Sequence, residues 1–303
     1  MFNKAIKKNV NQIELSRYIK SLISLMKPRV MSLVIFTCAV GFLTSNPNIK
    51  TFDAIIAIIL VALGSGAAGC LNMWYEADVD ALMTRTCLRP IPTGKINKQQ
   101  ALLFGIFLTI FSVSALYYFT NFLSAFLLFF TIAFYLFVYT IWLKRKTPQN
   151  IVIGGIAGSL PPVIGWAIST NSVSIVSVSL FLIIFFWTPS HFWALSLYKA
   201  DDYKKAKIPM MPITDGTEKT KFYILVYSLL MLPVIILPYA INFSSLIYFI
   251  PAMMLTVYYN FICYDLYRYK KNNFDLKKAK KVFGYSILYL FLIFLLFLVD
   301  HII

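Results

Sequence analysis

Charged residues, and acidic residues above all, are scarce in this chain. Only 12 of its 303 residues are Asp or Glu, and all charged types together make up 13%. Soluble globular domains carry roughly a quarter charged residues, so this composition excludes an ordinary soluble domain. Apolar residues make up 59%, and the mean hydropathy is +0.74. The composition therefore predicts a polytopic membrane protein.

Histidine and cysteine are also rare, with two and four residues. The cysteines show neither paired nor metal-type spacing, so we expect packing residues. The segment up to Ser24 has cations but no apolar core before a small-residue cleavage site, so we expect the first span to stay in place. The segment also lacks the Arg-rich, acid-poor character of a transit peptide, which favours a bacterial inner membrane over a mitochondrial one.

Long apolar stretches account for most of the chain. A bilayer core of roughly 30 Å requires about 20 apolar residues in a helix. The sequence predicts an all-α membrane protein, one transmembrane domain over residues 1–303, in contact with membrane lipid. The predicted spans are 30–47, 53–74, 101–118, 121–143, 150–169, 173–197, 222–241, 243–264 and 283–300.

The placement of the cations sets the expected orientation. The net charge is +16, and 27 of the 28 Lys and Arg residues fall on alternate loops, with only Lys50 on the other side. The positive-inside rule then places the N-terminus and the long loops in the cytoplasm, and the C-terminus outside. Because orientation accounts for the basic balance, we expect no nucleic acid partner.

Two similar segments suggest an internal duplication. Residues 75–78 (YEAD) and 198–201 (YKAD) each close an apolar stretch, 123 residues apart. Pseudo-repeats at about 25–146 and 147–270 would form two four-helix halves, with an extra helix at about 283–300. Such repeats often enclose a site at their interface. Prolines at 161, 162 and 189 should interrupt helical hydrogen bonding inside spans, and the carbonyls that this frees favour a central cavity. The alternative to a duplication is that the two short segments match by chance.

Oxygen-bearing side chains recur every four residues where the second span ends. Asn72, Glu76 and Asp80 should line one stripe of a continuous helix, with Asp78 on its other side. A cluster of like charges is costly unless cations lie between them. Oxygen-only ligands favour Mg²⁺, and because no His or Cys joins them zinc is disfavoured. The pattern predicts a magnesium site.

Basic residues lie near this cluster on the same side of the membrane. Arg85 and Arg89 follow it, and Lys144 and Arg145 close the fourth span. Mg²⁺ usually binds one or two carboxylates together with substrate phosphates, and Arg offers paired donors to phosphate. We therefore expect a diphosphate to complete the site. The alternative is a solvated loop whose acids and bases pair with each other.

A second acidic cluster follows the sixth span. Asp201 and Asp202 lie among cations that include Lys199 and Lys205. Two matching acidic clusters in basic surroundings favour function over a solvated loop. Our candidate metal ligands are Asn72, Glu76, Asp80, Asp201 and Asp202. Our candidate diphosphate ligands are Arg85, Arg89, Lys144, Arg145, Lys199 and Lys205.

A histidine lies inside the sixth predicted span, where ionisable residues are functional candidates. On a continuous helix His191, Tyr198 and Asp202 would share a stripe, with His191 roughly 16 Å below Asp202. This would place an imidazole below the diphosphate, where an acceptor molecule could enter. The alternative is a histidine hydrogen-bonded to a neighbouring helix. His301, near the C-terminus, is most simply an interface residue.

The motifs resemble those of a known family. The runs N-x-x-x-E-x-x-x-D from Asn72 and R-T-x-x-R-P from Arg85 resemble the first aspartate-rich motif of the intramembrane aromatic prenyltransferase superfamily. Three stretches resemble its heme-modifying branch, and the likeness covers nearly the whole chain. These stretches are KPRVMSLVIFT at 27–37, NIVIGGIAGSLPPVIGWA at 150–167 and HFWALSLYKADDYKKAKIPMMP at 191–212.

The resemblance implies an activity. That branch attaches a farnesyl group from farnesyl diphosphate to a vinyl group of heme b, using Mg²⁺ and giving heme O for terminal oxidases. Asn72, Glu76, Asp80 and Asp202 carry over as the catalytic residues that bind metal and diphosphate. We assign His191 and Tyr198 to the heme. The resemblance also allows a heme-modifying enzyme as a protein partner.

Two departures from the superfamily pattern bear on the acceptor. Glu76 stands where many members have Asp, and Ala206 stands where quinone-pathway relatives have a further Asp. Prenylation of a small aromatic acid or quinone precursor is the alternative within the superfamily. A heme or lipid transporter is the alternative outside it. A transporter would need polar groups along a path, whereas these acids gather on one face.

Overall fold

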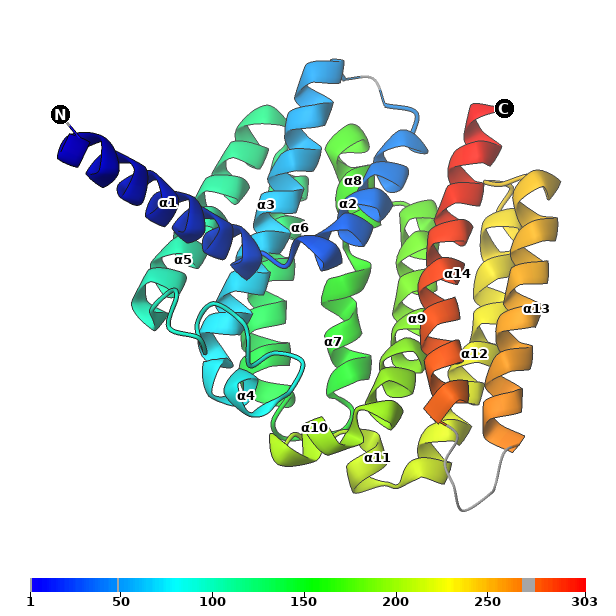
Figure 1. Cartoon of the computed structure of the whole chain (residues 1–303). Helices are drawn as coiled ribbons and strands as arrows, with labels where there is room; N and C mark the ends of the chain where they lie inside the picture. Colours follow the sequence, from blue (N-terminus) through cyan, green and yellow to red (C-terminus); the bar gives the residue numbers. More distant parts are fainter. Residues whose placement is uncertain (1, 48, 269–275) are drawn as a thin grey trace.

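The protein is helical throughout the part that the structure, a computed structural model, describes: residues 2–47, 49–268 and 276–303 (Figure 1). Eight segments are long and apolar enough to cross a membrane, and they match eight of the predicted spans. They are α3 (Thr51–Tyr75), α5 (Lys98–Phe119), α6 (Phe122–Ala133) with the π-helix η1 (Phe134–Leu143), α7 (Asn150–Ser159) with α8 (Pro161–Thr170), α9 (Ile175–Tyr198), α12 (Thr217–Ala240), α13 (Leu246–Arg268) and α14 (Leu276–Ile302).

The first predicted span differs from the structure. The helix at 30–47 is α2 (Pro28–Leu43), which is too short to count as a span by itself. It follows α1 (Phe2–Leu25), and the segments Glu14–Leu25 and Pro28–Leu43 meet at 53°. Lys27 at the break is left-handed, with φ 56° and ψ 58°. Pro28 explains the break, because a proline disfavours the α conformation in the residue before it. Within the described residues there are nine spans only if this bent pair counts as one.

The helices form two groups joined by a central pair (Figure 1). Helices α3, α5 and α6 pack together on one side, and α9, α12, α13 and α14 on the other. Between them α2 packs on α8, while α7 contacts both η1 and α9. The short helices α4 (Ala77–Leu82), α10 (Ala200–Lys205) and α11 (Met211–Thr214) gather at the end of the bundle opposite the C-terminus.

The predicted repeat finds a structural parallel. Helix α3 ends at Tyr75 and α4 begins at Ala77, while α9 ends at Tyr198 and α10 begins at Ala200. Both breaks thus fall at the same place in the two matching segments, 123 residues apart. The duplication itself stays a prediction, as does the central cavity between its halves.

The two proline predictions have different outcomes. Helix α7 ends at Ser159 and α8 begins at Pro161, so the interruption of the fifth span is confirmed. Helix α9 runs through Pro189, so the helix does not end there, although the proline has no N–H to donate to the carbonyl four residues earlier. Membrane helices tolerate a proline where neighbouring helices and hydroxyl side chains satisfy the freed backbone groups. The break in this region falls ten residues later, at Lys199.

Glycines let α2 and α8 touch through their backbones. A Cβ at Gly41 would lie 2.2 Å from the carbonyl oxygen of Pro162, and one at Gly165 would lie 2.0 Å from that of Cys38. No side chain fits at such distances. Close backbone approach at small residues is a usual source of helix association in membranes, where lipid tails are as apolar as side chains.

Gly165→Ala is therefore expected to destabilise the bundle by about 1–3 kcal/mol, the usual cost of overpacking. Gly158 in α7 is the matched control, because a Cβ there has no neighbour within 4 Å. The measurement is the fraction of detergent-purified protein that stays monodisperse after heating. Equal loss in Gly158→Ala and Gly165→Ala would show that the α2–α8 contact has no special weight.

The predicted orientation can be tested at two exposed loop positions, Ser172 between α8 and α9 and Lys95 before α5. In a variant without the half-buried Cys87, a membrane-impermeant thiol reagent on intact cells should label Ser172→Cys and leave Lys95→Cys unlabelled. This follows from the placement of the cations on the cytoplasmic side. The reverse labelling pattern would invert the topology.

Candidate active site

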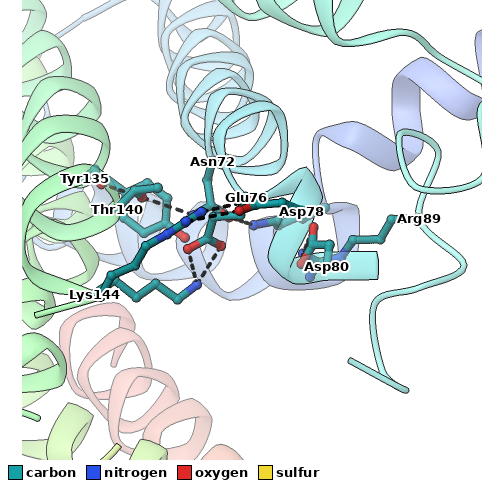
Figure 2. Close-up of polar contacts among 10 residues, drawn as sticks. Asn72, Glu76, Asp78, Asp80, Arg89, Tyr135, Thr140 and Lys144 are labelled. Carbon is teal, nitrogen blue, oxygen red and sulfur yellow. Dashed lines mark hydrogen bonds and ion pairs between the residues drawn. The ribbon is translucent and has the colours of Figure 1, made fainter. Parts of the chain in front are cut away.

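The first acidic cluster lies at a break between two helices. Glu76 caps α3 with φ −92° and ψ 14°, so the predicted continuous helix is wrong. The four-residue spacing nevertheless survives. The Glu76 N–H donates to the Asn72 carbonyl at 2.9 Å, and the Asp80 N–H donates to the Glu76 carbonyl at 2.8 Å. The three side chains follow one another across the break, as Figure 2 shows.

The row of Asn72, Glu76 and Asp80 is buried, whereas the neighbouring Asp78 is exposed. Asn72, Glu76 and Asp80 are each 2% exposed, whereas the side chain of Asp78 is 57% exposed. The prediction that Asp78 points away from the other three is confirmed. A buried carboxylate must be paired or must bind a metal, because leaving it unpaired costs several kcal/mol.

Each member of the row is held by a basic side chain from a different element. Lys27 Nζ donates to Asn72 Oδ1 at 2.6 Å. Lys144 Nζ lies 2.5 Å from Glu76 Oε1 and 2.6 Å from Oε2. Arg89 Nη1 donates to both oxygens of Asp80, at 2.8 and 2.7 Å. Acids and bases thus pair, as the solvated-loop alternative expected, but the acids are buried.

The π-helix η1 places two of the groups that face this row. Thr140 Oγ1 bonds to the carbonyl of Tyr135, five residues back, and accepts a hydrogen bond from Asn72 Nδ2 at 3.1 Å. The pairs Asn72–Thr140 and Glu76–Lys144 are both 68 residues apart. Moving four residues along α3 therefore corresponds to moving four residues along η1, so the two segments run side by side in the same direction. Turns of π-helix are frequent at functional sites.

Nearby charges shift the pKa values of Lys144 and Asp78 at this end of the bundle. Burial alone would lower the pKa of Lys144, but the adjacent Glu76 carboxylate more than offsets this and raises it. Burial alone would raise the pKa of Asp78, and hydrogen bonds from Arg145 offset this and lower it. Arg145 bonds to Asp78 through both terminal nitrogens, at 3.1 and 2.9 Å. Both cations stay charged at neutral pH.

The second motif meets the loop that follows the first. Thr84 Oγ1 donates to the Asp202 carboxylate, at 2.9 and 2.8 Å from its two oxygens. Lys199 Nζ lies 4.0 Å from Asp202. Asp202 is buried, whereas Asp201 is exposed. The structure therefore joins the two motifs through Asp202 and does not bring Asp201 to them.

The predicted cations divide into those that contact a buried carboxylate of the site and those that do not. Arg89 and Lys144 contact the buried row, and Lys199 lies beside the buried Asp202. The others lie outside it: Arg145 pairs with the exposed Asp78, and Arg85 and Lys205 have exposed side chains.

Three contacts of the site escaped the sequence prediction: Lys27, Thr84 and Thr140. Lys27 begins the first stretch that resembles the family, and a cation directly before an apolar helix was a usable signal. Thr84 and Thr140 gave no signal, because a threonine in a loop or an apolar run is common.

His191 and Tyr198 lie against α14. Helix α9 ends at Tyr198, so the stripe expected to reach Asp202 on one helix is wrong. His191 is buried, its Nδ1 is 2.7 Å from Ser286 Oγ, and its ring stacks on Trp187 and Phe283. Tyr198 meets Phe283 edge to face. The contact that we named as the alternative is thus present, and the heme role stays a prediction.

The buried oxygens suit a magnesium ion. Within the described residues no three His, Cys, Asp or Glu side chains cluster as metal ligands. The Asn72 amide oxygen, water and substrate phosphates are the oxygens that could complete a set with one or two carboxylates. Glu76 Oε1 is buried and makes no well-aligned hydrogen bond, although Lys144 is near it. Oxygen-only donors favour Mg²⁺. Asn72, Glu76 and Asp80 are the candidates to hold it, and a metal role for Asp202 stays a prediction.

Comparison with known proteins places this site in a family. The model of the UbiA prenyltransferase family matches residues 33–293. The chain belongs to the UbiA prenyltransferase family. It is 68% identical, over the full length of both chains, to a protein of Pelagibacter ubique named protoheme IX farnesyltransferase. It is 50% identical to protoheme IX farnesyltransferase 2 of Mesorhizobium japonicum, over 92% of this chain and 89% of that one.

Solved structures of the UbiA family share the fold. A digeranylgeranylglyceryl phosphate synthase has a TM-score of 0.77 at 18% identity, covering 94% of this chain and 99% of its own. A UbiA homologue of Archaeoglobus fulgidus, bound to DMAPP and Mg²⁺, has a TM-score of 0.62 at 19% identity, covering 90% of this chain and 99% of its own. At such identities the likeness establishes the fold of this UbiA family member.

Proposed function

We infer that this chain transfers a farnesyl group from farnesyl diphosphate to a vinyl group of heme b. Diphosphate leaves, the farnesyl carbon bonds to the end of the vinyl group, and water adds to the other vinyl carbon and loses a proton, which gives the hydroxyl group of the product. The observation that carries the inference is the buried row Asn72, Glu76 and Asp80, backed by basic side chains. It occurs in a chain 68% identical to a protein named for that reaction. The UbiA homologue bound to DMAPP and Mg²⁺ supports a metal and a prenyl diphosphate as ligands.

The residues at the break would bind the diphosphate end of the substrate. Mg²⁺, when bound, would neutralise negative charge on the leaving diphosphate. Lys27, Arg89 and Lys144 come from three elements and can donate to phosphate oxygens. Donors fixed in a largely buried site stabilise the charge that develops as the carbon–oxygen bond breaks.

Aromatic rings next to this row would face the allylic cation. The rings of Tyr135 and Tyr139 in η1 lie 5.2 Å apart, and Lys144 Nζ lies 5.7 Å from the centre of the Tyr139 ring. Aromatic faces attract cations and exclude water. The apolar spans around them would hold the farnesyl chain.

The acceptor and the setting complete the proposal. Ala206 caps α10 and is buried. Because this residue is an alanine, no carboxylate lies one turn after Asp202, and this favours heme over a quinone precursor as the acceptor. The protein is a multi-pass membrane protein with bacterial relatives. We propose a bacterial inner membrane with the site at the cytoplasmic face, and a heme-modifying enzyme as the next user of the product.

The test is turnover by the purified protein. With Mg²⁺ and farnesyl diphosphate it should convert heme b to a hydroxyethylfarnesyl product detectable by mass, and it should leave 4-hydroxybenzoate unmodified. Chelation of the metal should stop the reaction. Prenylation of 4-hydroxybenzoate but not of heme would move the protein to the quinone branch, and no product from either acceptor would favour a transporter.

A further inference from the structure

The basic side chains of the site occupy the positions that a metal ion would need. Lys144 Nζ lies between the two oxygens of Glu76, at 2.5 and 2.6 Å. Arg89 Nη1 lies between the two oxygens of Asp80, at 2.8 and 2.7 Å. A metal that approaches either carboxylate from this side, to bind one oxygen or both, would meet the cation that already contacts both oxygens. Each cation must therefore move before a metal can bind its carboxylate from this side.

The two negative charges of the row are already compensated, and Lys27 adds a further basic group beside Asn72. Two carboxylates, with side chains 2% and 3% exposed, face two cations whose side chains are 14% and 21% exposed. A divalent cation added alone would bring two uncompensated positive charges next to Lys144 and Arg89. Repulsion at such distances is strong where water is largely excluded. When a divalent ion arrives together with a diphosphate, the negative charge of the diphosphate compensates the positive charge of the ion.

We propose that Lys144 and Arg89 are exchangeable counter-ions, which release Glu76 and Asp80 to the metal only when a diphosphate offers them new acceptors. The hydrogen bond from Lys27 to Asn72 exchanges in the same way. The site then takes up metal and diphosphate as a unit and binds free metal weakly. This inference rests on the proposed function, because it assumes that the row binds metal and diphosphate.

The positions of the two cations allow the exchange. Lys144 follows η1 directly, and Arg89 lies in the loop after α4, so the two can move independently of α3. Both have flexible side chains that keep partial access to solvent. When a metal binds the two carboxylates, Lys144 and Arg89 lose their buried hydrogen-bond acceptors. Phosphate oxygens of the diphosphate then accept hydrogen bonds from the two cations. Because the exchange links the two ligands, each must strengthen the binding of the other by the same factor.

The test measures Mn²⁺ binding to the full-length protein in detergent by electron paramagnetic resonance, with and without inorganic diphosphate. A protein-free titration corrects for the complex formed in solution. We expect diphosphate to tighten Mn²⁺ binding about tenfold or more. In Lys144→Gln the metal alone should bind more tightly than in the wild type, and the effect of diphosphate should shrink.

Lys146→Gln is the matched control, because it removes the same charge two residues away from an exposed side chain. It should leave both affinities unchanged. Arg89→Gln should behave like Lys144→Gln, which keeps the test decisive if one of the two variants fails to fold.

Three outcomes overturn parts of the account separately. Independent binding of Mn²⁺ and diphosphate to the wild type would overturn the exchange and leave the proposed function standing. Tighter metal binding in Lys146→Gln as well would reduce the effect to net charge and also overturn the exchange. Failure of the folded wild type to bind either ligand would overturn the proposed function itself.

Discussion

Glu76→Gln and Asp80→Asn are each expected to lower farnesyl transfer by about 100-fold or more. Both substitutions remove a buried negative charge from the row that would hold the metal, and they barely change side-chain volume. Losing one preorganised electrostatic contact to a transition state typically costs that much. Turnover should be measured with heme b, Mg²⁺ and saturating farnesyl diphosphate, on protein that elutes as a single peak in detergent.

Asp78→Asn is the matched control for these two variants. It makes the same chemical change two residues from both, but at an exposed side chain that pairs with Arg145. Surface ion pairs contribute little, so activity should stay near the wild-type value. Glu76→Asp keeps the charge on a shorter side chain and should retain part of the activity. An essential Asp78 with a dispensable Glu76 would show that the buried row is not the site.

His191→Ala is expected to lower heme turnover at least about tenfold, the loss that one buried polar contact to a ligand supports, while leaving diphosphate binding intact. The reason is separation: His191 lies inside α9, whereas Asp202 lies in α10 beyond the helix break. The measurements are turnover with varied heme and Mn²⁺-dependent diphosphate binding on the same preparation.

Ser286→Ala separates a heme role from a purely structural one. It removes the partner of His191 Nδ1 and leaves the imidazole between Trp187 and Phe283. If His191 contacts heme, this variant should keep most heme turnover although it loses some thermal stability. If His191 only ties α9 to α14, both variants should lose stability and turn over heme normally per folded molecule. That second result would refute the heme assignment.

Local sequence was enough to locate eight spans and the first motif. In a bilayer every backbone group must be satisfied within its own segment, so a long apolar stretch has the helix as its available structure. Hydropathy therefore located eight spans, and the Pro161 break followed from a missing N–H. The row from Asn72 to Asp80 depended only on local spacing, which hydrogen bonds preserved even across the break at Glu76.

Which side chains meet across the site depends on helix packing, and local sequence does not show it. Lys27 contacts Asn72 across 45 residues, and Thr84 contacts Asp202 across 118. Such pairs depend on how helices pack and in which register, and the π-helical turns that bring Thr140 and Lys144 to α3 have no local signature. Packing also buried Asp202 and exposed Asp201, which are adjacent in sequence. The hydrogen-bond partner of His191 also depends on packing, because Ser286 reaches it only where α14 packs against α9.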